Sequence, residues 1–128
     1  MLQDHLRQLE EKLEIKAVSP PADPNTFTIT IDPELDVTFH NLEDGIFFES
    51  QLCEVPERNR EDIFIMLSEA NLMGQGSLNS IFGMTKDKKH LIMTHFIDYD
   101  VSFQQFYDIL EDYVNLAKIT QEEIKSKV

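Results

Sequence analysis

The sequence predicts an α+β domain in which helices pack against one antiparallel sheet. Two patterns carry this prediction. Apolar residues recur at helical spacing near both ends of the chain and in residues 59–73, whereas in residues 26–54 and 80–98 they alternate as strands require. The predicted order is helix, three strands, helix, two strands, helix, which is typical of α+β architecture.

The first predicted helix carries a narrow apolar stripe. The stripe consists of Leu2, Leu6, Leu9 and Leu13, and charged residues surround it. The helix must end before Ser19, because Pro20 lacks an amide hydrogen and favours extended geometry in the residue before it. A loop through residue 25 follows.

Three antiparallel strands are predicted over residues 26–31, 35–40 and 46–54. Their alternating apolar residues are Phe27, Ile29 and Ile31 in the first, Leu35, Val37 and Phe39 in the second, and Ile46, Phe48 and Leu52 in the third. Turns at residues 32–34 and 43–45 connect them. Phe47 is left on the opposite face of the third strand.

The rest of the domain is predicted to organise around residues 59–98, which read as a helix over residues 59–73, a glycine break and a β-hairpin. Asn59 is the expected N-cap, and Gly74 and Gly76 are expected to end the helix. One face, with Ile63, Met66, Leu67, Ala70 and Met73, has the spacing needed to cover a sheet.

The same helix is also apolar on its other side. Ile65 and Leu72 lie roughly opposite the core face, with Phe64 at their flank. A second apolar face indicates either contact with a second copy of the chain or burial between two elements of its own fold. We favour self-association, because the chain offers few elements to cover that side.

A hairpin and a long core helix complete the predicted domain. Strands over residues 80–85 and 90–98 flank a charged tip at residues 86–89, and both faces of the second strand carry apolar side chains. The last helix begins at Ser102, whose spacing to Gln105 fits a capping box. We expect one domain over residues 1–118 and a polar, frayed tail over residues 119–128.

Composition narrows the function classes. At 128 residues and 41% hydrophobic positions, the chain is long enough for a core without staples. Its net charge of -13 argues against binding nucleic-acid phosphates. Cys53 is the only cysteine and is expected to be a buried bystander, which fits a reducing cytoplasm. Neither a signal peptide nor a membrane-spanning run is recognisable, so we expect a soluble cytoplasmic protein.

Catalytic chemistry finds little support. The tightest polar cluster is His95, Asp98 and Asp100, but His95 is in phase with the apolar positions of its strand. The other histidines are expected at strand ends (His40 and His90) or on an exposed helix (His5), without evident partners. We predict no catalytic, metal or cofactor-binding residues and no cofactor, while an enzyme using His95 and Asp98 stays open as an alternative.

Several segments together resemble a known family. Residues 64–74 read FIMLSEANLMG, a helix closing in Ala-Asn-Leu before glycines. They are followed by Phe82-Gly83-Met84, by the charged residues 86–89 and by Leu91-Ile92-Met93. The first helix ends in LEEKL. This pattern resembles the class I type III secretion chaperones, the Tir chaperone family of Gram-negative pathogens, from Leu2 to about Ala117.

The resemblance implies a small cytoplasmic homodimer that binds the N-terminal segment of one or more secreted effectors and keeps it soluble and secretion-competent. It implies neither catalysis nor membrane insertion. The family's dimer interface then falls on Phe64, Ile65, Ser68 and Leu72. The alternative is a small dimeric regulatory adaptor that binds a folded secretion or transcription regulator.

The resemblance also implies a client-binding surface on the first helix and the sheet. The candidates are Leu2, Leu6, Leu9, Leu13, Phe27, Ile29, Val37, Phe39 and Phe47. Leu9 and Leu13 can equally be core residues, so Leu2 and Leu6 are the preferred client contacts. Addition of a client strand to a sheet edge is a second implied binding mode.

Overall fold

A computed structural model describes residues 2–14, 17, 23, 25–73, 80–98 and 100–128. Its helices are α1 (Leu2–Leu13), α2 (Arg60–Met73) and α3 (Phe103–Lys127), and its strands are β1 (Thr26–Asp32), β2 (Leu35–Leu42), β3 (Gly45–Glu54), β4 (Ile81–Met84) and β5 (His90–Ile97). The predicted element order and the α+β class are confirmed.

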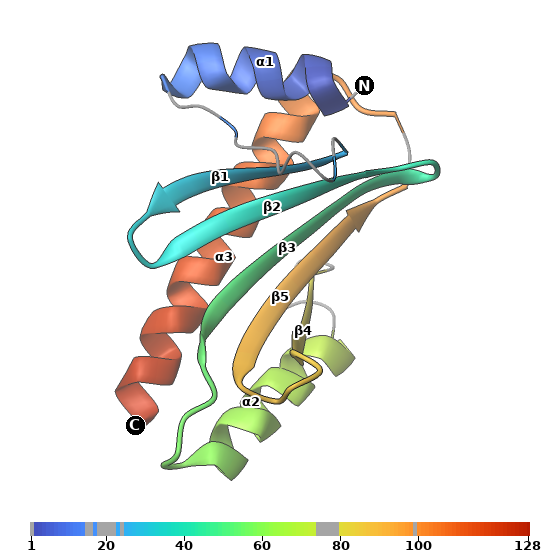
Figure 1. Cartoon of the computed structure of the whole chain (residues 1–128). Helices are drawn as coiled ribbons and strands as arrows, with labels where there is room; N and C mark the ends of the chain where they lie inside the picture. Colours follow the sequence, from blue (N-terminus) through green and yellow to red (C-terminus); the bar gives the residue numbers. More distant parts are fainter. Residues whose placement is uncertain (1, 15–16, 18–22, 24, 74–79, 99) are drawn as a thin grey trace.

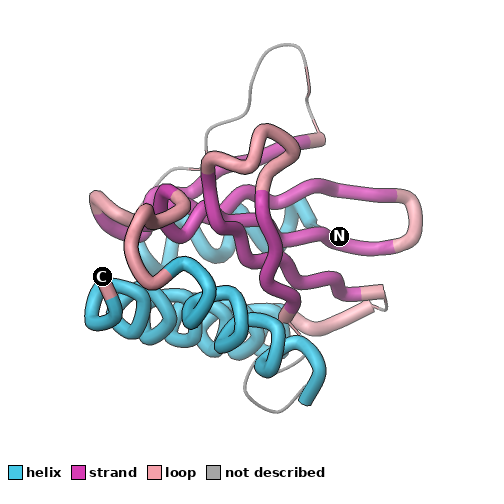
Figure 2. The backbone as a smooth tube through the Cα atoms, turned by 90° about the horizontal axis from the view of Figure 1, so that it is seen from below, coloured by secondary structure: helices cyan, strands magenta, loops and turns pink. Residues whose placement is uncertain are grey.

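The strands form one antiparallel sheet in the order β1-β2-β3-β5-β4. Helix α3 runs across the sheet, and α1 lies near its N-terminal end (Figure 1). Figure 2 shows α2 and α3 on the same side of the strands. The fold thus has two layers, and the side of the sheet away from α3, called here the outer sheet face, carries neither of these two helices.

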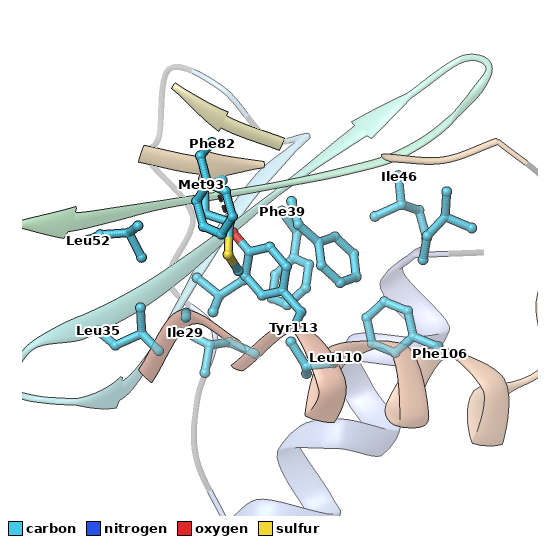
Figure 3. Close-up of a cluster of buried hydrophobic side chains, with 14 of the residues drawn as sticks. Ile29, Leu35, Phe39, Ile46, Leu52, Phe82, Met93, Phe106, Leu110 and Tyr113 are labelled. Carbon is cyan, nitrogen blue, oxygen red and sulfur yellow. Dashed lines mark hydrogen bonds between the residues drawn. The ribbon is translucent and has the colours of Figure 1, made fainter. Parts of the chain in front are cut away.

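Aromatic rings from the sheet and α3 form the centre of the core (Figure 3). Phe48 meets Phe39 edge-on at a centroid distance of 4.9 Å, and Tyr113 edge-on at 5.4 Å. The Tyr113 hydroxyl donates to the Met93 carbonyl at 2.9 Å, which satisfies its polar end inside the core. Phe106 closes the cluster 5.8 Å from Phe48.

The turn between β2 and β3 requires glycine. Gly45 has a φ of 159°, and a Cβ built on it would lie 2.0 Å from the Ile97 carbonyl oxygen. No side chain fits there, because β5 passes directly beside this position. The predicted turn at residues 43–45 is therefore also a point of close contact between strands.

Helix α3 is longer than predicted, and the expectation of a frayed tail is wrong. Its capping box is present, with the Gln105 amide donating to the Ser102 hydroxyl at 3.1 Å and the Ser102 amide donating to the Gln105 side chain at 2.9 Å. The helix then continues to Lys127, with Thr120, Gln121 and Ile124 buried. These residues pack on the sheet, so the last turns belong to the domain.

Helix α2 begins directly after Asn59, as predicted, but the contact of the Asn59 side chain differs from the expected one. Asn59 has a φ of 54°, and its backbone carbonyl accepts from the Ile63 amide at 3.1 Å. Its side-chain amide donates to the Lys127 carbonyl, so the side chain connects the start of α2 to the end of α3. The predicted helix stops, Gly74 and Gly76, lie outside the described residues.

Candidate interaction surfaces

Helix α2 has two apolar faces, as predicted. Ile63 and Leu67 are buried in the core, whereas Ile65 is 50% exposed and Leu72 is 86% exposed. Ser68 is exposed and Phe64 is half-buried beside them. Within the described part of the chain, no element covers Ile65 and Leu72, so this face offers apolar surface to another molecule.

A groove runs between α2 and β4. It has a volume of about 210 Å³ and is lined by Phe64, Leu67, Ser68, Asn71, Phe82, Gly83, Met84 and Leu91. Ile81, which precedes Phe82 in β4, is 61% exposed, unusually high for an isoleucine in a strand. The groove shares Phe64 and Ser68 with the exposed face of α2, so the two surfaces adjoin.

Asn71 joins α2 to β4 through two hydrogen bonds to one residue. Its Oδ1 accepts from the Phe82 amide at 2.7 Å, and its Nδ2 donates to the Phe82 carbonyl at 2.8 Å. The Thr85 amide donates to the His90 carbonyl, which fixes the alternation of the β4–β5 ladder. The amide and carbonyl of Phe82 consequently point away from β5, toward the outer edge of the sheet.

Strand β1 is the other edge of the sheet. The backbone amide of Asn41 donates to the Asn25 carbonyl at 2.8 Å. Because hydrogen-bonded and non-hydrogen-bonded pairs alternate along the β1–β2 ladder, the amides and carbonyls of Thr28 and Thr30 face away from β2. In the described residues no further strand pairs with this edge. Residues 26–31 contain neither Lys nor Pro, the residues that commonly prevent strand addition at an exposed edge.

The predicted client residues divide sharply by burial. Ile29, Val37 and Phe39 are 0% exposed on the inner face of the sheet, and Leu2, Leu6 and Leu9 are likewise buried, because α1 packs its stripe onto the core. Phe27 and Phe47 are half-buried, and Leu13 is 38% exposed. The preference for Leu2 and Leu6 over Leu13 as surface contacts is thus reversed in this structure.

The outer sheet face carries an aromatic pair that was only partly predicted. Phe96 of β5, 44% exposed, lies opposite Phe47 of β3 in the strand register. His40 extends this row, with its ring centroid 5.8 Å from that of Phe47. Phe96 was missed as a site residue, although the apolar residues on both faces of β5 were the signal for it.

The histidines have partners or burial that the sequence did not reveal. His5, expected on an exposed face, is buried and stacks on Phe106 at a centroid distance of 4.9 Å. His40 Nδ1 lies 3.3 Å from the Thr26 hydroxyl, and its Nε2 lies 3.6 Å from the Glu49 carboxylate. His95 Nδ1 lies 3.1 Å from the Ser80 hydroxyl.

Burial favours the uncharged forms of His95 and Cys53. Burial lowers the pKa of His95, and burial, assisted by the charge of Glu54, raises the pKa of the Cys53 thiol. Across the described ranges, no group of three or more His, Cys, Asp or Glu side chains is placed to hold a metal ion. Nor does any helix within them have the length and apolar character to cross a membrane.

Comparison with known proteins identifies the family of this chain. The sequence matches the Tir chaperone protein (CesT) family over residues 4–121. The chain belongs to this family. The match spans α1 to most of α3, so it includes both sheet edges and the α2 face. No curated protein matched the sequence individually.

Solved structures share the Tir chaperone fold of this chain at low sequence identity. A chain of the ExsC–ExsE complex matches with a TM-score of 0.78 and 15% identity, covering 94% of this chain and 91% of that one. A chain of the HopA1–SchA chaperone–effector complex gives 0.72 and 12%, covering 94% and 93%. YbjN of E. coli, a proposed transcription regulator, gives 0.67 and 15%, covering 97% and 91%.

Proposed function

We propose that this chain is a type III secretion chaperone of the bacterial cytoplasm. It binds the N-terminal segment of one or more secreted effectors in extended form, and it keeps that segment soluble and competent for secretion. The observation that carries the proposal is the family match over residues 4–121. The function requires neither catalysis nor a cofactor.

The physical task is to hold an apolar, non-globular segment away from other such segments. A protein that binds the unfolded segment shifts its equilibrium away from aggregation by mass action, without ATP. The net charge of -13 keeps such a complex soluble through repulsion between complexes. Open apolar surface and high charge are therefore compatible in one small domain.

Client binding is assigned to the β1 edge and the side chains around it. A client strand adds to the outward-facing groups of Thr28 and Thr30, while apolar client side chains contact Phe27 and Leu13. Phe47 and Phe96 on the outer sheet face extend the apolar surface. The buried leucines of α1 contribute indirectly, because they hold that helix in place.

The homodimer is assigned to the exposed face of α2. Its residues are Phe64, Ile65, Ser68 and Leu72, which border the groove beside β4. This surface is apolar at its centre, as dimer interfaces are, and a two-fold interface pairs the same face with itself.

The test is recovery of the protein with its partners from lysate of the source bacterium, followed by mass spectrometry and light scattering of the complex. Recovery of secreted proteins bound through their N-terminal regions to two copies of this chain is expected. Each client is then tested as an isolated N-terminal peptide and as a protein lacking that segment. Binding of the truncated protein but not the peptide would contradict the proposal.

A regulatory adaptor is the second candidate, and the likeness to YbjN favours it. An adaptor recognises a folded partner, so its binding is lost when that partner is unfolded. A chaperone of the proposed kind binds the isolated segment equally well. The peptide experiment therefore separates the two functions.

A further inference from the structure

The two edges of the sheet differ in what covers their backbone groups. On β1, the outward-facing groups of Thr28 and Thr30 belong to a strand of seven residues, Thr26–Asp32. On β4, a strand of only four residues, the outward-facing amide and carbonyl of Phe82 are both bonded to Asn71. Among the described residues, no strand pairs with the β1 edge, whereas the β4 edge is closed at Phe82.

The Asn71 side chain bonds Phe82 as a neighbouring strand would. A strand added to β4 would exchange two hydrogen bonds with Phe82, one to its amide and one to its carbonyl. The Asn71 amide group supplies an acceptor at 2.7 Å and a donor at 2.8 Å to the same two groups. An aspartate or leucine at this position cannot supply both.

We propose that Asn71 closes the β4 edge against strand addition, so that strands add to this sheet only at β1. The excluded strand is that of a second copy of the chain or of a client. Exclusion of a client rests on the proposed function, whereas exclusion of a second copy does not. The apolar rim at Ile81 and Met84 makes such exclusion necessary, because an exposed apolar edge invites pairing.

The direct test is amide hydrogen exchange in the Asn71→Ala variant. Alanine keeps the helical propensity of α2 and removes both hydrogen bonds. The Phe82 amide is expected to exchange about tenfold faster or more than in the wild type. The Gly83 amide, which faces β5, is expected to keep its rate, and Glu69→Ala, an adjacent exposed position, is the matched control.

The functional test is the size of the protein by light scattering over a range of concentrations. Asn71→Ala is expected to form species larger than those of the wild type at the same concentration. Adding Met84→Pro is expected to restore the wild-type size, because the Met84 amide also faces outward and proline there blocks strand addition without breaking the β4–β5 ladder.

An unchanged exchange rate at Phe82, or a wild-type size for Asn71→Ala at every concentration, would overturn the proposal. Larger species that persist with Met84→Pro would also overturn it, since they would arise from general unfolding. If Asn71→Ala does not fold, Asn71→Asp keeps the acceptor for the Phe82 amide and loses only the donor. Asn71→Asp is then expected to form species larger than those of the wild type at the same concentration, and wild-type behaviour would contradict the idea.

Discussion

Gln121 shows how one buried side chain ties the C-terminal helix to the sheet. Hydrogen-bonded pairing of β2 with β3 ends at Thr38 and Glu49, although both strands continue beyond this point. The Gln121 Nε2 donates to the carbonyls of Glu34 and Leu52, each at 2.8 Å, where the two strands separate. It thereby satisfies two carbonyls that the ladder leaves unpaired.

Replacing Gln121 with Ala is expected to lower the free energy of unfolding by about 2 kcal/mol, because one carbonyl in the β1–β2 turn and one in β3 lose their donor. Urea denaturation monitored by circular dichroism measures the change. Gln104→Ala is the matched control, since Gln104 is exposed and bonds only Asp108 on its own helix. Equal stability of the two variants would show that water replaces the Gln121 amide without cost.

His5 makes the packing of α1 on α3 sensitive to acid. Burial lowers the pKa of His5, and the Val101 backbone offsets part of this effect. The folded-state pKa lies below the ordinary value of 6.5. At pH values between these two pKa values the unfolded state binds more protons than the folded state. The free energy of unfolding therefore falls as the pH drops below 6.5. The free energy of unfolding is therefore expected to be lower at pH 5 than at pH 7.5.

Denaturant titrations at the two pH values test this expectation, with His5→Phe as the comparison. Phenylalanine stacks on Phe106 and carries no proton, so its variant is expected to lose part of the pH dependence. The remainder belongs to His95, whose pKa burial also lowers. A pH dependence identical to that of the wild type would exclude His5 as its source.

At the scale of elements, periodicity was sufficient for the core helices and strands but not for their surroundings. The two faces of α2 were predictable, because Ile65 and Leu72 break a pattern that one buried face would satisfy. The end of α3 was not, because the contacts of Gln121 lie on β3 and the β1–β2 turn, far away in the sequence. The polar composition of residues 119–128 therefore predicted a frayed tail, whereas the structure has a packed helix there.

The client surface was predicted only in part, for a related reason. An amphipathic stripe such as Leu2, Leu6 and Leu9 has the same spacing whether it packs on its own core or on another chain. Only the arrangement of α1 against α3 decides that these leucines are buried. The open edge of β1 likewise depends on strand order, which the alternation of residues does not contain.

A proline at Thr30 tests the β1 edge. Thr30 is exposed and its amide faces away from β2, so Thr30→Pro is expected to keep the fold while removing a donor for a client strand. Client affinity is expected to fall about tenfold or more, measured by calorimetry with the peptide recovered from the lysate. Thr30→Ala keeps the amide and serves as the control.

Two results would count against the β1 edge. Unchanged affinity for Thr30→Pro would place the client strand elsewhere on the protein. An equal loss for Thr30→Pro and Thr30→Ala would mean that the side chain, and not the backbone, contacts the client. Circular dichroism of both variants establishes that the fold is retained.

At the scale of the whole molecule, the surface proposed to bind the client and the surface proposed to bind a second copy lie at opposite edges of the sheet. The β1 edge presents backbone groups and suits an extended segment of variable sequence, because main-chain bonds need no particular side chain. The α2 face presents side chains without free backbone groups, and suits one fixed partner with a matching surface. A second copy of the chain is that partner in the proposed assembly.

Leu72→Asp tests the assembly. At 86% exposure Leu72 contributes little to the core, so the variant is expected to fold. In a two-fold interface each copy places its own aspartate in an apolar contact, and the dimer is expected to weaken by about 2 kcal/mol or more, roughly thirtyfold in dissociation constant. Light scattering is expected to show a monomer at concentrations where the wild type is dimeric.

Leu42→Asp is the matched control, because Leu42 is 49% exposed and lies at the end of β2 rather than on α2. It is expected to remain dimeric. A dimeric Leu72→Asp protein would place the interface elsewhere. A monomer that still binds the client peptide with wild-type affinity would show that each chain carries a complete β1 site, and that dimerisation serves to join two client-binding edges in one particle.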